Sequence, residues 1–134
     1  MEHTFAHNAL PGSLELACLG DTIYDLYVRR HLVHRGGRVQ KMHREAASLV
    51  CAHAQSEALR HIEEVLSEEE AAVARRARNA HQNPPRHADP AEYHRATSLE
   101  ALIGYLYLTG RQARIDELMR RMLPEEYAEE SHEK

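Results

Sequence analysis

The sequence predicts an all-α domain. No segment of useful length alternates apolar and polar residues with the period of two that a strand requires. Helix start signals instead precede the apolar segments, and Gly and Pro pairs stand between them. With 134 residues, of which 43% are apolar, the chain is long enough for a single core. We expect one domain over residues 1–124 and a disordered acidic tail over residues 125–134.

The first helix is expected over residues 14–31. A Pro-Gly pair precedes Ser13, whose hydroxyl is a good N-cap. A Gly-Gly pair then predicts a turn over residues 35–38. After this turn, we expect either one helix or a broken pair of helices over residues 39–66.

Two further helices have clear start signals. Ser67 and Glu70 form a capping box, which opens a helix that is expected to end near residue 80. Asp89 is an N-cap followed by Pro at the first helical position, and its helix is expected to end at Gly110. The remaining segments are an irregular loop over residues 81–88 and a last amphipathic helix over residues 111–122.

Several protein classes are excluded by what the sequence lacks. The first ten residues contain no basic start followed by an apolar run, so we expect no signal peptide. No apolar run approaches the roughly 20 residues that span a bilayer, so we expect no membrane partner. Cys18 and Cys51 are too few for a disulfide framework, and we interpret them as small core residues in a reducing cytoplasm.

The most informative residues are carboxylates inside apolar segments. Glu100 is the only charged residue in the segment 96–109, and Asp21 and Asp25 are the only charges in the segment 16–28. A buried carboxylate without a partner costs several kcal/mol, so a cation or a function normally compensates it. The two segments together predict a divalent-cation site with oxygen ligands.

The neighbouring residues in the sequence indicate different roles for these carboxylates. Asp25 has Arg29 four residues later and can pair with it on the solvent side, whereas Asp21 has no base three or four residues away. Gly20 and Gly104 lie in helix interiors, where Gly is about 1 kcal/mol less favourable than Ala. Close approach of another backbone would compensate for this cost, which predicts one packed seam that brings Asp21 and the second segment together.

Basic residues are strongly segregated, although the net charge is −4. The segments 26–44 and 71–88 contain no acidic residue. Such patches are typical of phosphate binding, and the alternative is a solvated cationic face. The candidate nucleic-acid-binding residues are Arg35, Arg38, Lys41, Arg75, Arg76, Arg78, Asn79 and Arg86.

Three segments together resemble the catalytic domain of the ribonuclease III family. The first reads Gly-Asp-Thr-Ile-Tyr-Asp-Leu-Tyr-Val-Arg over residues 20–29, and the second reads Arg-Arg-Ala-Arg-Asn-Ala over residues 75–80. The third reads Glu-Ala-Leu-Ile-Gly-Tyr-Leu-Tyr-Leu-Thr-Gly over residues 100–110. The resemblance extends over nearly the whole chain and is greatest to the Mini-III ribonucleases, which lack a separate double-stranded-RNA-binding domain. It implies that residues 1–124 are a catalytic domain.

The resemblance also implies which residues act. Larger ribonuclease III enzymes carry additional carboxylates where this chain has Leu14, Ala17 and Thr97, and Mini-III enzymes are similar to this chain in lacking them. Asp21 and Glu100 match the remaining family carboxylates and are expected to be the catalytic and Mg²⁺-binding residues. Water and RNA oxygens would complete the Mg²⁺ shell. Asp25 and Thr97 are candidate supporting residues beside this pair.

The implied activity is hydrolysis of phosphodiesters in double-stranded RNA. Mg²⁺ would activate a water for in-line attack, and the family leaves 5′-phosphate and 3′-hydroxyl ends. The basic segments would hold the duplex through its backbone shape and 2′-hydroxyls. The resemblance to Mini-III further implies a homodimer and maturation of the large-subunit (23S) ribosomal RNA precursor, which we expect in the cytoplasm. A ribosomal protein is a candidate accessory partner, and the sequence leaves open whether cleavage needs one.

Other functions receive less support from the sequence. A non-catalytic dimeric RNA-binding or ribosome-assembly protein of the same fold would not need both acidic signature residues, and this chain retains both. A helical protein-interaction module would not need the basic segments. The chain has eleven histidines, but no His-Asp doublet or helical histidine pair that supports a zinc or phosphohydrolase site.

Overall fold

The described part of the protein, residues 10–123 of a computed structural model, is helical and contains no strand. The predicted tail over residues 125–134 lies outside the described residues. The all-α prediction is confirmed. In order along the chain, the elements are α1 (Ser13–Arg35), α2 (Val39–Val50), α3 (Ala52–Arg60), the short 3-10 helix η2 (Glu63–Val65), α4 (Glu68–Arg78), α5 (Pro90–Leu108) and α6 (Gln112–Met122).

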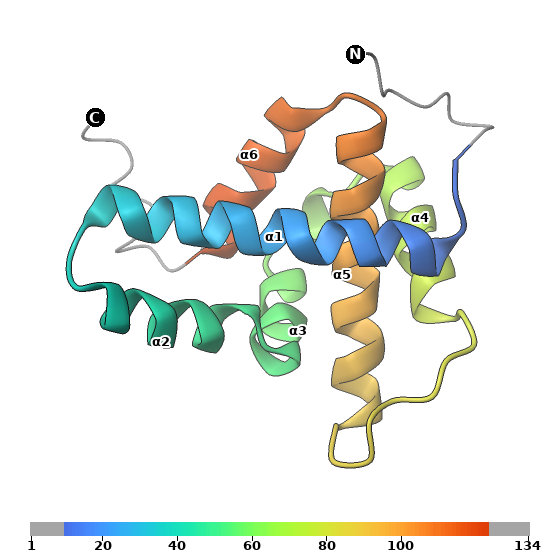
Figure 1. Ribbon diagram of the computed structural model, residues 1–134. Helices are drawn as coiled ribbons and strands as arrows, with labels where there is room; N and C mark the ends of the chain where they lie inside the picture. Colours follow the sequence, from blue (N-terminus) through green and yellow to red (C-terminus); the bar gives the residue numbers. More distant parts are fainter. Residues whose placement is uncertain (1–9, 124–134) are drawn as a thin grey trace.

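Helix α5 is the centre of the fold. Helices α1, α3, α4 and α6 all pack against it, and α1 crosses it at a large angle (Figure 1). Leu99, Leu102, Ile103 and Leu106 of α5 are completely buried because neighbouring helices cover several of its faces. This placement explains why the segment is apolar around most of the helix and shows no single solvent face.

The crossing of α1 and α5 is a contact between two backbones. A Cβ atom added to Gly20 would lie 1.6 Å from the carbonyl oxygen of Glu100. A Cβ atom added to Gly104 would lie 2.1 Å from the carbonyl oxygen of Leu16. Neither position has room for a side chain, so the packed seam that the two glycines predicted is present.

Helix α1 differs from its prediction at both ends. Its N-cap is Gly12 rather than Ser13, and the Gly12 N–H donates to Oε1 of Glu15 at 3.1 Å. The helix also continues about one turn beyond residue 31, because no helix breaker occurs before Gly36. Gly36 has a φ of 86°, a left-handed conformation that glycine adopts without strain.

The other start signals are confirmed. Segment 39–66 is a broken helix pair, with the break at Cys51 between α2 and α3. Ser67 Oγ accepts from the Glu70 N–H at 3.1 Å, and Asp89 Oδ1 accepts from the Ala91 N–H at 2.9 Å. Gly110 follows α5 with a φ of 76°, as expected after a helix end.

The prediction that both cysteines are core residues is wrong. Cys18 and Cys51 are both exposed. The buried stripe of α1 runs through Leu16, Ala17 and Gly20, and Cys18 lies outside it. Cys51 lies at the break between α2 and α3. Within residues 10–123, no helix is long and apolar enough to cross a membrane.

Candidate active site

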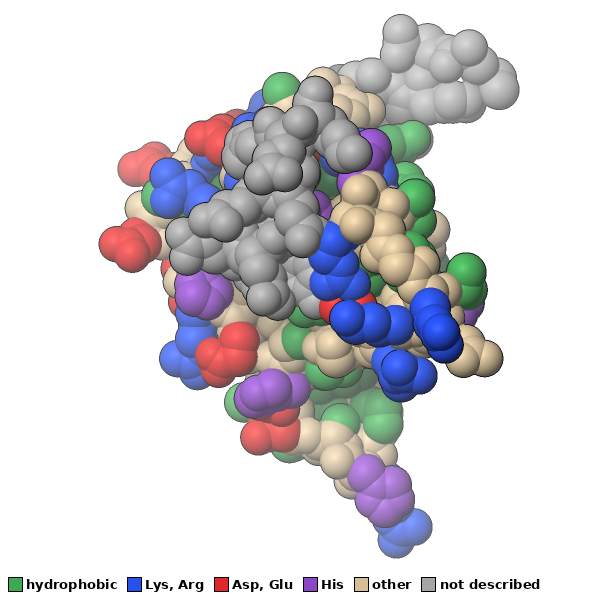
Figure 2. Space-filling view, turned by 90° about the vertical axis from the view of Figure 1, so that its left-hand side faces the viewer, with side chains coloured by type: hydrophobic (Ala, Val, Ile, Leu, Met, Phe, Trp, Pro, Cys, Tyr) green, Lys and Arg blue, Asp and Glu red, His purple; other side chains and the backbone are tan. Residues whose placement is uncertain are grey.

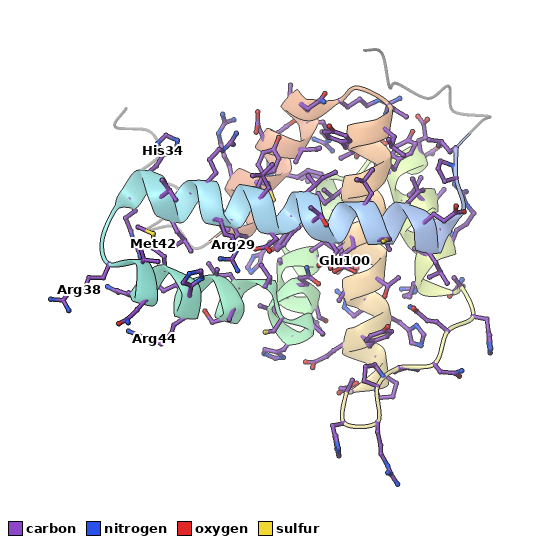
Figure 3. The ribbon with its side chains drawn as sticks, viewed as in Figure 1. Arg29, His34, Arg38, Met42, Arg44 and Glu100 are labelled. Atoms are coloured by element: carbon purple, nitrogen blue, oxygen red, sulfur yellow. The ribbon has the colours of Figure 1, made fainter. Side chains whose placement is uncertain are left out.

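The α1–α5 crossing brings Asp21 and Glu100 together. Gly20 rests on the backbone of Glu100, so the next residue of α1 projects beside the Glu100 side chain. Figure 3 shows Glu100 immediately beside α1, on the side that faces α3. Glu100 is half-buried, whereas Asp21 is exposed, so the site opens to solvent along α1.

The two carboxyl groups interact strongly. Burial, together with the hydrogen bond to Asp21 and repulsion from Asp21, raises the pKa of Glu100 from its usual value to about 8. The amide of Gln55 opposes this increase in pKa. At neutral pH and without a cation, Glu100 therefore holds a proton. A divalent cation held by the two carboxyl groups would take the place of this proton.

Gln55 of α3 is a site residue that the sequence did not reveal. Its side chain is 2% exposed, and its amide is the polar group that α3 contributes next to Glu100. A single Gln in the sequence Ala-His-Ala-Gln-Ser is typical of any solvent-facing helix position. Only the packing of α3 against α5 identifies it.

Asp25 does not join the pair. Its Oδ1 accepts from Nε of Arg29 at 2.7 Å, and both side chains are substantially exposed. Arg29 also lies 3.3 Å from Nδ1 of His43 on α2. Among the described residues, no group of three or more His, Cys, Asp or Glu side chains is arranged to hold a metal. Asp21 and Glu100 are thus the acidic part of the site.

Thr97 lies one turn before Glu100 on α5 and is buried. Its hydroxyl donates to the Tyr93 carbonyl at 3.0 Å and accepts from Nε2 of Gln82 at 2.9 Å. These bonds connect α5 to the loop that precedes it. The hydroxyl is therefore engaged in holding this loop rather than directed to the carboxylate pair.

The first basic segment forms a surface on α2. Arg38, Lys41 and Arg44 are exposed, and Lys and Arg side chains gather where α1 ends and α2 begins (Figures 2 and 3). Arg35 differs from these three residues, because its guanidinium forms a bidentate pair with Glu45. This pair joins α1 to α2, so the observed role of Arg35 is structural.

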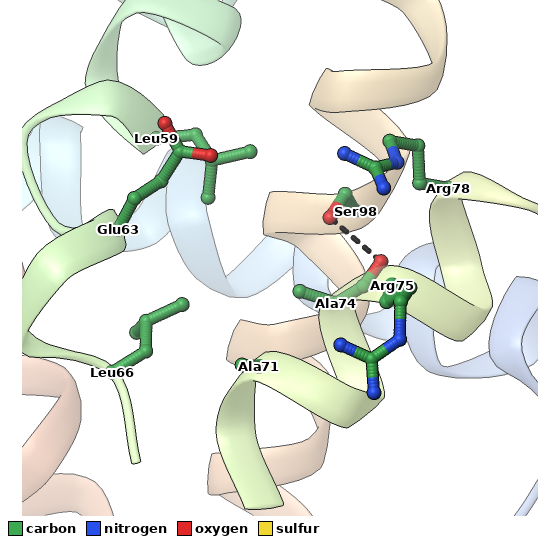
Figure 4. A pocket seen from close by; sticks show the side chains of 8 residues that line it. All are labelled: Leu59, Glu63, Leu66, Ala71, Ala74, Arg75, Arg78 and Ser98. Atoms are coloured by element: carbon green, nitrogen blue, oxygen red, sulfur yellow. Dashed lines mark hydrogen bonds between the residues drawn. The ribbon is translucent and has the colours of Figure 1, made fainter. Parts of the chain in front are cut away.

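The second basic segment covers the end of α4 and the loop after it. Arg75, Arg76, Arg78, Asn79 and Arg86 are exposed there. Arg75 and Arg78 border a small hollow of about 150 Å³ between α3, α4 and α5, whose apolar lining includes Leu59 and Leu66 (Figure 4). This hollow does not include Asp21 or Glu100.

Comparison with known proteins identifies the family to which this fold belongs. Residues 14–111 match the model of the ribonuclease III domain. The chain belongs to the ribonuclease III family. Both carboxylates lie inside the matched region, and the family makes the chain an endoribonuclease that acts on double-stranded RNA.

Relatives within the ribonuclease III family support the assignment. The chain is 47% identical to the Mini-ribonuclease 3 of Symbiobacterium thermophilum over 79% of this chain and 83% of that protein. It is 41% identical to the Mini-ribonuclease 3 of Brevibacillus brevis over 84% of this chain and 85% of that protein. A crystal structure of a Fusobacterium nucleatum protein superimposes with a TM-score of 0.76 at 33% identity, over 81% of this chain and 89% of that chain.

Proposed function

We propose that this endoribonuclease is magnesium-dependent and that Asp21 and Glu100 hold the ion. The observation that carries the proposal is the half-buried Glu100, whose pKa is raised to about 8 beside a second carboxyl group. A protein that needed this residue only for folding would gain by replacing it with an apolar one. The pair also lies where two helix backbones touch, so its geometry is fixed.

The donor set fits Mg²⁺. The ion prefers oxygen ligands, takes one or two carboxylates from a protein and keeps several waters. When bound, it would activate a water and stabilise the charge that develops on the phosphoryl oxygens. The exposed side of Asp21 leaves room for RNA oxygens, and the main chain at Gly20 fixes where the two carboxylates stand.

The basic surfaces are proposed to hold the RNA duplex. The triple variant Arg76→Ala, Arg78→Ala, Arg86→Ala should weaken binding to duplexes of different sequence alike. The slope of log affinity against log salt should fall by roughly one for each phosphate that the variant no longer neutralises. Arg60→Ala is a matched control, because Arg60 is equally exposed but pairs with Glu57 at 3.5 Å. An unchanged slope in the triple variant would move the RNA to another surface.

The biological setting completes the proposal: a cytoplasmic homodimer that matures the large-subunit (23S) ribosomal RNA precursor, with a ribosomal protein as accessory. The strands of a duplex are related by local two-fold axes, so a symmetric dimer presents one site to each strand. A mixed dimer with Glu100→Ala in one subunit should nick one strand per encounter, whereas the homodimer should leave staggered ends. Double-strand breaks by the mixed dimer in one encounter would exclude this arrangement.

The deciding experiment is a cleavage assay on duplex RNA with Mg²⁺ or EDTA. Wild-type protein should cut only with Mg²⁺, and the mapped ends should carry 5′ phosphates. Binding without cleavage at any Mg²⁺ concentration would instead support a non-catalytic RNA-binding protein of this fold. Mapping the ends that the enzyme makes on a precursor of 23S RNA then tests the proposed substrate.

A further inference from the structure

Gln55 is a buried polar side chain at the active site. It belongs to α3, which packs against α5 near the level at which α1 crosses it (Figure 1). Its side chain is only 2% exposed. Burying an amide costs free energy unless it is hydrogen-bonded, so the amide needs its own explanation.

The amide nitrogen lacks the regular hydrogen bond that its neighbours have. Within the described residues, Nε2 of Gln55 has no partner in favourable geometry. Two nearby buried hydroxyls are paired: Ser56 Oγ accepts from Nε of Arg95 at 3.1 Å, and Ser98 Oγ donates to the Ala74 carbonyl at 2.8 Å. Buried donors in native proteins are rarely left without an acceptor. The acceptor that this one would use is therefore of interest.

The candidate acceptor is the Glu100 carboxyl of α5, because α3 packs against α5 and the Gln55 amide lowers the pKa of this carboxyl. We propose that Gln55 is a positioning residue, whose Nε2–H donates to one carboxylate oxygen of Glu100 and holds the other oxygen toward Asp21 and the metal. This inference rests on the proposed function, since the oriented carboxylate oxygen serves the metal.

An amide suits this position for an electrostatic reason. Two carboxylates balance the charge of one divalent cation, and a third would add repulsion to a site that is partly shielded from water. An amide orients a carboxylate without adding charge. Groups that hydrogen-bond to metal ligands in this way typically change metal affinity or activity by roughly 10–100-fold when they are removed.

The test is Gln55→Met, which keeps the length and volume of the side chain but removes the amide. Binding of Mn²⁺ to the full chain without RNA, measured by calorimetry, should weaken by about 10–100-fold. In duplex cleavage at fixed Mg²⁺, kcat should fall while KM for RNA stays level. In a Glu100→Gln background, Gln55→Met should have no further effect on Mn²⁺ affinity.

Ser98→Ala is the matched control. It removes a different buried polar group, on α5 rather than α3, and should lower thermal stability while leaving Mn²⁺ affinity unchanged. Wild-type Mn²⁺ affinity and kcat in a folded Gln55→Met protein would overturn the inference while leaving the proposed function intact. Absence of metal binding and cleavage in the wild type would overturn both.

A second measurement covers the case in which Gln55→Met does not fold. The side-chain NH₂ resonances of Gln55 in wild-type protein should shift when Mg²⁺ is added without RNA. The same resonances should not respond in Glu100→Gln. If Mg²⁺ binds to the wild type and these signals do not move, the Gln55 amide does not position Glu100.

Discussion

Two glutamates of this protein are largely shielded from water, and they differ in whether a cationic side chain compensates their charge. Glu70 of α4 is 3% exposed and accepts from Nε and Nη2 of Arg114 at 2.9 and 2.8 Å. It also accepts from the Ser67 N–H at 2.9 Å. Among the described residues, no cationic side chain compensates Glu100 of α5; its neighbours are the carboxyl of Asp21 and the amide of Gln55.

The electrostatic consequences have opposite signs. Burial alone would raise the pKa of Glu70, but the hydrogen bonds and attraction from Arg114, with those from Ser67, outweigh burial and leave the pKa below its usual value. Burial and Asp21 raise the pKa of Glu100 to about 8. A buried carboxylate with its own cation is compensated within the fold, whereas one that lacks it is a candidate site for a cation from outside.

The largest expected effect comes from neutralising one carboxylate of the uncompensated pair, Asp21 and Glu100. Asp21→Asn or Glu100→Gln should reduce cleavage by roughly 10³-fold or more, because the charge holds the metal. Duplex binding should persist, and metal-free thermal stability should stay level or rise because the cost of holding an ionisable carboxyl in a partly buried site is removed. Gel-based cleavage, RNA binding and thermal melting check the three parts. Full activity in either variant would refute the site.

The next largest effect should come from breaking the compensated pair. Arg114→Ala leaves the Glu70 carboxylate buried without its cation and should cost about 3 kcal/mol of unfolding free energy. Chemical denaturation measures this loss. Below the new melting temperature, kcat should match that of wild type, and a selective fall in kcat would show that the two glutamates are not independent.

The pH dependence of stability should differ in sign between the two sites. Without metal, Glu100 binds its proton more tightly in the folded protein than in the unfolded chain. Its contribution to the free energy of unfolding is therefore complete below about pH 4.5 and is lost as the pH rises to about 8. The contribution of Glu70 is instead present at neutral pH and is lost in acid, below its usual pKa of 4.5. Each such contribution to the free energy of unfolding is about 1.4 kcal/mol for each unit by which the pKa differs between the folded and unfolded states.

Denaturation in EDTA from about pH 5 to about pH 8 provides the measurement. Stability of the wild type relative to Glu100→Gln should decline across this range, and Mg²⁺ should reduce the decline. A difference that does not change with pH would show that Glu100 is ionised without metal.

The smallest expected effect concerns the cap next to Glu70. Ser67→Ala removes the hydroxyl that accepts from the Glu70 N–H at 3.1 Å and should cost about 1 kcal/mol. Cleavage and metal affinity should be unchanged. A loss of metal affinity in Ser67→Ala would mean that α4 supports the metal site and that the two glutamates are coupled.

The contrast also shows what a sequence can reveal. Glu100 was recognisable because a charge interrupts an apolar segment, and Gly104 because glycine is unfavourable in a helix interior. These signals are local. The all-α class and the capping residues Ser67 and Asp89 were predicted for the same reason, since capping depends on neighbours within one turn.

The features that were missed depend on distant partners. Glu70 was expected only as part of a capping box, and its burial requires Arg114, which is 44 positions away. Arg35 was grouped with RNA-binding residues because Glu45 lies one residue beyond the acid-free segment 26–44. Gln55 becomes informative only when α3 meets α5. In each case the decisive neighbour comes from another helix.

In the proposed metal site, the main-chain contact at Gly20 and Gly104 would influence the size of the ion that Asp21 and Glu100 can hold. The backbone positions from which Asp21 and Glu100 project depend on how closely α1 and α5 approach, and at Gly20 and Gly104 this approach is main chain against main chain. Mg²⁺ binds oxygen at about 2.0–2.1 Å and Ca²⁺ at about 2.3–2.6 Å, a difference that a rigid gap can discriminate and a flexible loop cannot. In the proposed site, selection among cations would therefore depend on the two glycines as well as on the ligands themselves.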